Sequence, residues 1–285
     1  MIEGFDLTVD DQDNITSVLI SFIKNQPGFV LQIAPGYVLY RCILYENKPQ
    51  SFNDIIYPPK QFAKLNRANR EGIQVFYAAC NRTAALFEIG AKIGDTIAIG
   101  KWVFERSVKL ANAGYSKINF SPKREIPMWG KFDDTSFNLE IRAFVMDYIA
   151  EKFSQQINQS SPYLYKLTVG IAEAIMRKEH IKGIIYPTIK LAGLNDNIVL
   201  KKSVIDSGEL KFINVEWIKI IDIVGDTFVC DISDFAKEFG RDRFLYWKGG
   251  PGEWNTIGSP GWYFDHDEGG WDIVRDASGA IIEKS

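Results

Sequence analysis

A strand that leads directly into a helix within residues 73–89 is the sequence feature that most constrains the fold. Residues 73–78 read Ile-Gln-Val-Phe-Tyr-Ala, a short run of β-branched and aromatic residues that predicts a strand. Thr83 can cap a first helical turn, and the Ala-Ala-Leu that follows it favours helix. Glu88 comes about one turn later, where we expect it on the inner side of the helix.

The rest of the chain alternates between the same two kinds of element. Apolar residues at helical spacing, together with capping signals, predict further helices at residues 15–23, 139–153 and 162–180. Runs rich in β-branched and aromatic residues predict further strands at residues 36–45, 95–104, 183–187, 197–200 and 211–224. Helices and strands are therefore mixed along the chain, and the fold class that we expect is α+β.

The length of the chain, 285 residues, exceeds the usual size of one domain. We expect an N-terminal helical extension at residues 1–36, one large α+β domain at residues 37–239 and an appendage at residues 240–285. The appendage is rich in Gly and Trp. Its last piece is expected to form a hairpin that turns near Asp276 to Gly279.

Charge and cysteine content exclude several classes of protein. The 33 basic and 36 acidic residues leave a net charge of −3, without the basic excess that nucleic acid attracts, so we expect no direct binding of nucleic acid. Cys42, Cys80 and Cys230 form none of the close pairs of zinc or redox motifs. The sequence shows no signal-peptide pattern and no apolar run of membrane-spanning length. We therefore expect a cytoplasmic protein with reduced thiols and no membrane association.

Several common catalytic motifs fail in this sequence. Residues 94–101 look like a phosphate-binding loop, but they have one residue too many between the glycines, and Trp102 replaces the required hydroxyl. His180 and His266 are the only histidines, which leaves little for Ser-His-Asp catalysis or histidine-based metal sites. The acidic residues within 265–268 lack calcium-loop spacing and are expected to form a solvated turn. We therefore expect no metal, and chemistry based on Arg, Tyr, Glu, Thr and Asn.

Residues 67–88 hold such side chains at close spacing. Arg67 opens an Arg-x-Asn-x-x-Gly turn, Tyr77 follows 10 residues later, and Glu88 follows Tyr77 by 11 residues. The turn leads into a strand that ends Tyr-x-Ala, and the next helix ends Ala-Leu-x-Glu. This series resembles the signature of the RES-domain family.

Two further pieces extend the resemblance over residues 37–203. Upstream, the Leu-Tyr-Arg step that ends at Arg41 is similar to the aromatic-Arg step with which RES domains open. Downstream, residues 183–188 read Gly-Ile-Ile-Tyr-Pro-Thr and resemble the Gly-Ile-x-Tyr-Pro-Ser strand of the family, with Thr188 in place of its serine. Threonine keeps the hydroxyl and adds a methyl group that restricts its rotamer.

An asparagine of the family has two candidates here. Asn195 and Asn197 both follow Gly193. We prefer Asn197, because Ile-Val-Leu follows it as the strand of the family would.

The resemblance implies a fold and an activity. RES domains are similar to ADP-ribosyltransferases of the diphtheria-toxin type, with a split, mixed β-sheet core and flanking helices, so residues 37–239 would form an NAD-binding domain. NAD would be the substrate. The chain would be the toxin of a toxin–antitoxin system, cleaving the nicotinamide–ribose bond as a glycohydrolase or phosphorylase and depleting cellular NAD. A cognate antitoxin of the Xre type would be its partner.

Two other functions stay open from sequence alone. One is an ADP-ribosyltransferase that modifies a protein target, and the other is an inactive module that binds an NAD-like ligand or a partner. The oligomeric state is open as well, a homodimer included.

The residues of the motif suit NAD cleavage. Planar guanidinium groups at Arg67 and Arg41 can bind a pyrophosphate bidentately. Tyr77 offers a flat face to nicotinamide, and the Glu88 carboxylate can stabilise the ribosyl cation that forms when nicotinamide leaves. We therefore expect Arg67, Tyr77 and Glu88 to be catalytic.

Other polar residues have supporting or external roles in this interpretation. Thr188 and Asn197 can form hydrogen bonds with ribose or carboxamide, so we expect them to bind NAD together with Arg41, Arg67 and Tyr77. Two more arginines of the segment, Arg70 and Arg82, are expected to face solvent or to bind a partner.

Overall fold

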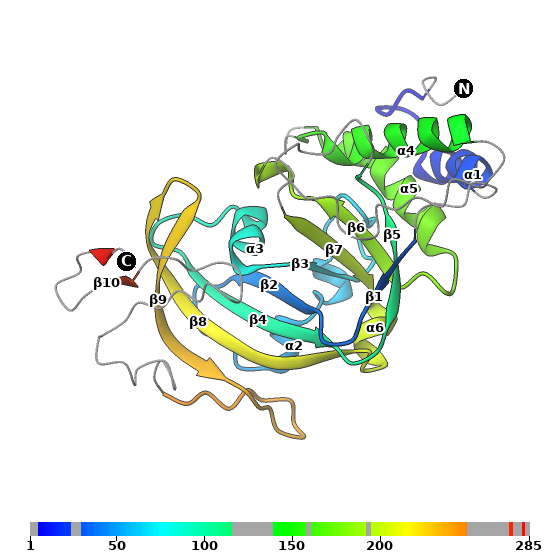
Figure 1. Cartoon of the computed structure of the whole chain (residues 1–285). Coiled ribbons are helices and arrows are strands. Elements are labelled where there is room, and N and C mark those ends of the chain that lie inside the picture. Colours follow the sequence, from blue (N-terminus) through cyan, green and yellow to red (C-terminus); the bar gives the residue numbers. More distant parts are fainter. Residues whose placement is uncertain are drawn as a thin grey trace. The chain divides into compact units, whose positions relative to one another are not determined.

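The elements form where the residue patterns favour them, as Figure 1 shows for the computed structural model of the chain. The structure describes residues 5–23, 30–115, 139–157, 161–191, 195–249, 274–275 and 281–282. The helices are α1 (Gln12–Ile23), α2 (Phe52–Ile55), α3 (Arg82–Ile89), α4 (Leu139–Ser154), α5 (Tyr165–Met176) and α6 (Lys202–Asp206), with short 3-10 turns η1 (Lys60–Phe62), η3 (Pro162–Leu164) and η4 (Ile189–Leu191). The strands are β1 (Val30–Ile33), β2 (Val38–Leu44), β3 (Val75–Ala79), β4 (Thr96–Phe104), β5 (Val108–Asn112), β6 (Gly183–Pro187), β7 (Asp196–Lys201), β8 (Leu210–Val224), β9 (Thr227–Ala236), β10 (Val274–Arg275) and β11 (Ile281–Ile282). The predicted α+β class is confirmed.

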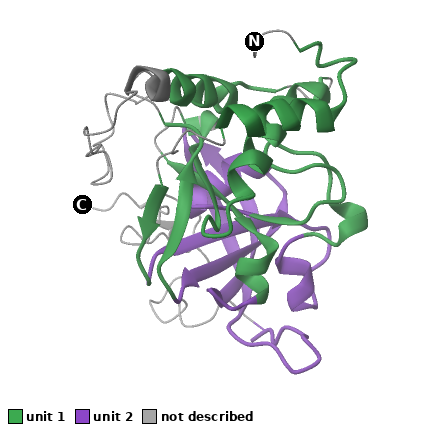
Figure 2. Cartoon of the chain, turned by 90° about the vertical axis from the view of Figure 1, so that its right-hand side faces the viewer, with its two compact units in different colours: residues 1–35, 58–76, 106–206 green, residues 36–57, 77–105, 207–285 purple. Residues whose placement is uncertain are grey.

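The chain divides into two compact units, which Figure 2 shows in different colours. Unit 1 combines Met1–Pro35, Pro58–Phe76 and Arg106–Asp206. Unit 2 combines Gly36–Tyr57, Tyr77–Glu105 and Ser207–Ser285. Both units thus draw on separate stretches of the chain, whereas the sequence suggested three consecutive segments, and that segment division stays a prediction.

Strands of unit 1 follow the order β1-β5-β6-β7. The β1–β5 and β6–β7 pairs are antiparallel, and the β5–β6 pair is parallel, so the sheet of this unit is mixed. All five residues of β6 are buried. The first residue of β6, Gly183, has to be glycine because β7 lies so close to it: a Cβ atom at this position would lie 2.1 Å from the carbonyl oxygen of Val199.

Helix α1 packs on α5 within unit 1 (Figure 1). Ile15, Leu19 and Ile23 recur at helical spacing on α1, and all three are buried. Gly170 of α5 permits the helices to approach closely, because a Cβ atom there would lie 2.7 Å from Cδ1 of Leu19. The helix predicted at residues 15–23 is therefore confirmed.

Strands of unit 2 follow the order β3-β2-β4-β8-β9, in which β3 contributes its last residues from Tyr77 on, and the described strand pairs are all antiparallel. Cys42 of β2 lies opposite Ile99 of β4, which in turn lies opposite Glu216 of β8. The β8–β9 hairpin turns at Gly225, whose φ of 58° is in the left-handed region that favours glycine. More than one strand was expected within residues 211–224, but the structure forms a single long strand there, β8.

Aromatic side chains form a cluster around α2 in unit 2. The ring of Phe52, the first residue of α2, stacks on Phe239 with the ring centroids 4.1 Å apart. Trp102 and Phe212 pack against Phe52 at centroid distances of 5.6 and 5.4 Å. Ser51 and Asp54 fix the start of α2 with a capping box. The aromatic cluster and the capping box together hold α2 in place.

Helix α3 packs on β2 in unit 2 (Figure 1). The side chain of Asn81 caps the helix by accepting a hydrogen bond of 2.8 Å from the backbone N–H of Ala84. Gly90 ends the helix in the left-handed conformation, with φ at 69°. The cap predicted at Thr83 is wrong, because the helix already begins at Arg82 and its N-cap is therefore Asn81.

Arg82 is buried, with 3% of its surface exposed. Its Nη2 and Nε atoms donate to the two carboxylate oxygens of Glu216 at 2.9 and 3.2 Å. The guanidinium also lies 4.7 Å from the ring centroid of Tyr40. The expectation that Arg82 faces solvent is wrong, because a buried carboxylate from a distant strand compensates its charge.

Two of the cysteines lie close to this ion pair. Burial raises the pKa of the Cys42 thiol and of the Cys230 thiol, and the nearby positive charge of Arg82 opposes the shift. Burial therefore favours the neutral form of both thiols.

Parts of the predicted tail and insertion lie outside the described residues. These are residues 116–138, 250–273, 276–280 and 283–285, which include the acidic group at 265–268 and the predicted hairpin turn. The short strands β10 and β11 that flank this turn pair antiparallel, as a hairpin requires. Over the described part of the chain, no helix is both long and apolar enough to cross a membrane.

Removing the buried carboxylate of Glu216 is expected to destabilise the protein far more than removing an exposed one. Glu216→Gln leaves the Arg82 charge buried without its partner and should lower the free energy of unfolding by about 3–5 kcal/mol. Asp206→Asn removes the partner of Lys202 in an ion pair whose side chains are 42% and 45% exposed, and should cost less than about 1 kcal/mol. Urea titrations of both variants and the wild type measure the difference, and equal losses would contradict it.

Candidate functional site

Arg41 and Tyr77, both in unit 2, are joined by a hydrogen bond. Arg41 lies on β2, where its Nη1 donates to the carbonyl oxygen of Tyr77 at 2.8 Å. Its Nε donates to the carbonyl oxygen of Ile56 at 2.9 Å. Burial lowers the pKa of Arg41 to about 10, so the side chain stays charged at neutral pH. Arg41 therefore fixes the backbone from which the Tyr77 ring projects.

Tyr77 and Glu88 are less buried than their neighbours. On β3 the Tyr77 side chain is partly exposed, whereas Phe76 and Ala78 on either side are buried. Glu88 lies in the last turn of α3 and is exposed. The inner side of this helix is formed by the buried residues Ala84, Ala85 and Leu86 instead. Unit 2 thus presents an exposed carboxylate at Glu88 and a partly exposed phenol at Tyr77.

Arg67, in unit 1, binds the end of a helix. It is 9% exposed, and its Nη1 and Nη2 atoms donate to the carbonyl oxygens of Phe153 at 2.8 Å and Gln155 at 3.0 Å. A longer bond of 3.5 Å reaches the carbonyl oxygen of Lys152. The last carbonyls of a helix have no partners within the helix and carry partial negative charge, which a guanidinium satisfies. Arg67 therefore caps the C-terminus of α4.

The turn that follows Arg67 explains why the motif contains Asn and Gly. The backbones of Asn66 and Asn69 exchange hydrogen bonds of 3.1 and 3.3 Å. The Asn69 side chain, itself buried, donates to the carbonyl oxygens of Lys64 and Arg70. Gly72 has a φ of 76°, which side chains other than glycine rarely adopt. Asn69 and Gly72 of the Arg-x-Asn-x-x-Gly pattern therefore serve this tight turn.

Thr188 and Asn197 are buried in unit 1, at 0% and 3% exposure. The backbone N–H of Thr188 donates to the carbonyl oxygen of Asn195 at 2.8 Å, just beyond the end of β6. Asn197 on β7 lies opposite Tyr186 on β6. Asp196, the neighbouring residue on β7, accepts a hydrogen bond from the hydroxyl of Tyr115. The two predicted residues thus lie on adjacent segments at one end of the β6–β7 pair.

The structure gives Arg70 a role inside unit 1. Its Nε and Nη2 atoms donate to the Glu173 carboxylate at 2.6 and 2.7 Å, and its Nη1 pairs with Asp13. These carboxylates raise the pKa of Arg70. The expectation that Arg70 faces solvent or binds a partner needs correction, because the side chain joins the loop after Arg67 to α1 and α5.

Sequence reasoning placed six residues in a single site, and they divide between the units. Arg67, Thr188 and Asn197 belong to unit 1, and Arg41, Tyr77 and Glu88 belong to unit 2. Sequence reasoning did not assign a role to the buried carboxylate of Glu216. A glutamate among the apolar residues of a predicted strand is unusual and could have indicated one.

Comparison with known proteins does not identify a relative: no protein-family model and no curated protein matches the chain. Within the described ranges, no three His, Cys, Asp or Glu side chains gather in a way that would hold a metal ion. The family and its NAD chemistry are therefore treated below as proposals.

Replacing Arg67 with Met is expected to release the end of α4. The variant leaves the carbonyl groups of Phe153 and Gln155 without their donor, and each buried group left unsatisfied costs about 1–3 kcal/mol. Hydrogen exchange followed by mass spectrometry should show amides of the last turn of α4 exchanging at least about tenfold faster. Arg106→Met, at an exposed position of the same unit, should leave these amides unchanged. Unaltered protection in the Arg67 variant would contradict the capping role.

Proposed function

We propose that the protein binds NAD and cleaves the bond between nicotinamide and ribose. The observation that carries this proposal is the ordered series Arg67, Tyr77 and Glu88, with its turn, strand and helix, which resembles the RES-domain signature. The local structure around Tyr77 and Glu88 supports it. Both side chains reach solvent in unit 2, and Arg41 holds the backbone of Tyr77 in place.

The proposed reaction needs little more than a carboxylate and an aromatic face. The nicotinamide nitrogen leaves with the electron pair of the glycosidic bond, and positive charge develops on the ribose carbon. Glu88 stabilises this charge, and Tyr77 holds the departing ring. The oxygen of water then bonds to the ribose carbon and loses a proton, which gives ADP-ribose, nicotinamide and H⁺. If phosphate is the acceptor, the product is ADP-ribose phosphate.

Arg67 has both a structural and a proposed binding function. A guanidinium carries five N–H donors, and the described bonds to the end of α4 use three of them. We assign the remaining donors to the pyrophosphate of NAD. Thr188 and Asn197 are assigned to ribose or carboxamide on the resemblance alone.

The wider biological setting is part of the same proposal. The chain would act in the cytoplasm as a toxin that depletes NAD, held inactive by an Xre-type antitoxin. Its fold would be ADP-ribosyltransferase-like, and the parallel β5–β6 pair among otherwise antiparallel strands of unit 1 supports a mixed sheet of that kind.

Glu88→Gln is expected to abolish most of the NAD cleavage. The amide keeps the size of the side chain and removes the charge that stabilises the ribosyl cation, so the rate of nicotinamide release should fall about 10²–10³-fold. Chromatography of nicotinamide and ADP-ribose after incubation of purified protein with NAD measures it. Because Glu88 is exposed, the variant should fold like the wild type.

Glu238→Gln is the matched control, since it removes an exposed carboxylate from the same unit. It should retain the full rate. No nicotinamide release by the wild type at high enzyme concentration would contradict the proposal, and labelled NAD that leaves a covalent mark on cell protein would replace it with ADP-ribosyl transfer.

A further inference from the structure

A pocket of about 410 Å³ lies within unit 1, separate from every residue assigned above to NAD. Its walls are the segment after Arg67, the last turns of α5, and the junction of β7 with α6. This volume lies in the range of pockets that hold small molecules. We propose that the pocket binds a small organic anion, with its charged group at Arg177 and Lys201 and its apolar body between Val75 and Met176.

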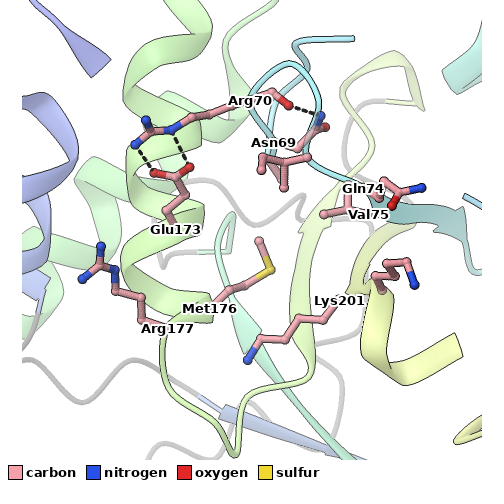
Figure 3. Close-up of a pocket in the computed structure, with 11 residues that line it drawn as sticks. Asn69, Arg70, Gln74, Val75, Glu173, Met176, Arg177 and Lys201 are labelled. Atoms are coloured by element: carbon pink, nitrogen blue, oxygen red, sulfur yellow. Dashed lines mark hydrogen bonds and ion pairs between the residues drawn. The ribbon is translucent and has the colours of Figure 1, made fainter. Parts of the chain in front are cut away.

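The charged end of the pocket is defined by two cations from different elements. Arg177 follows α5, is exposed, and makes no ion pair within the described part of the chain. Lys201, the last residue of β7, is partly buried and donates to the carbonyl oxygen of Lys178 at 3.0 Å. Figure 3 shows Lys201 at the lower edge of the pocket and Arg177 at its left, below Glu173.

The environment of Lys201 favours a negative ligand. Burial and the neighbouring charge of Lys182 lower the pKa of Lys201. An anion beside Lys201 would offset both effects, because it supplies the opposite charge in a partly desolvated place. A cationic ligand would add a further positive charge to an edge that already holds several.

The opposite edge of the pocket is already neutralised. Arg70 and Glu173, at the upper edge in Figure 3, form a bidentate ion pair with N–O distances of 2.6 and 2.7 Å. Arg70 pairs with two carboxylates, Glu173 and Asp13, so this edge offers no uncompensated positive charge to an anionic group. The two edges therefore orient the ligand, with its anion at the Arg177 and Lys201 end.

Apolar side chains line the space between the two edges. Val75 is buried, Met176 is partly buried, and Ile73 exposes 51% of its surface beside them. Among the described residues that line the pocket, none is aromatic. A compact apolar body such as one phenyl ring suits this lining, and a phosphate monoester or a carboxylate suits its charged end.

Three probes that share one ring test the proposal: phenyl phosphate, benzoate and phenol. Isothermal titration calorimetry of the full chain should show phenyl phosphate or benzoate binding at least about tenfold more tightly than phenol, because a charge-assisted hydrogen bond is stronger than a neutral one. Preference for phenyl phosphate would assign the site to phosphate esters, and preference for benzoate would assign it to carboxylates. Equal binding of all three, or no binding, would overturn the proposal.

Charge removal tests whether the binding occurs in this pocket. Arg177→Gln together with Lys201→Gln should weaken binding of the preferred anion at least about tenfold. Arg106→Gln together with Lys109→Gln removes the same two charges from exposed positions of unit 1 and should leave binding unchanged. If the double variant unfolds, Arg177→Gln alone serves as the test. Its side chain is exposed, so this variant should fold, and it should still weaken binding of the preferred anion. Equal affinities for the pocket and control variants would overturn the assignment.

This inference goes beyond the proposed NAD cleavage and can fail separately from it. Glu88→Gln should bind the probes as the wild type does, because Glu88 belongs to unit 2. Probe binding in a protein that releases no nicotinamide would retain the pocket and reject the enzyme.

Discussion

The buried ion pair between Arg82 and Glu216 is the interaction on which the proposed chemistry of unit 2 depends most. It joins the first residue of α3 to β8, and Tyr40 of β2 covers the guanidinium. Glu88 lies in the last turn of the same helix, so the pair helps to determine where the proposed catalytic carboxylate projects. A buried charge pair contributes little net stability but tolerates few alternative arrangements, which suits a helix that must keep one orientation.

Hydrogen bonds from arginine side chains to main-chain carbonyl oxygens hold the rest of the motif in place. Arg41 binds the carbonyl of Tyr77, and Arg67 binds the end of α4. Residues that resemble a catalytic signature therefore also hold the local structure. In the proposed reaction, a substitution at Arg67 would loosen α4 as well as remove the proposed contact with NAD, so Glu88, which is exposed, is the cleaner position at which to test the chemistry.

Local sequence patterns predicted helices and strands well, but they did not predict ion pairs between residues that are far apart in the sequence. The helix at residues 15–23 and the strand and helix within 73–89 are present, because periodicity and capping act over a few residues. Arg82 and Arg70 were expected at the surface, yet their carboxylate partners lie 134 and 103 residues away, where no local pattern reveals them. The predicted site residues could be chosen by resemblance, but their division between two units follows from the topology of the strands.

The most direct measurement of the central claim is a crystal structure of the Glu88→Gln protein soaked with NAD. The account predicts the nicotinamide ring against Tyr77 and the adjoining ribose beside the side chain at position 88. NAD bound away from both residues, or absent at saturating concentration, would contradict it.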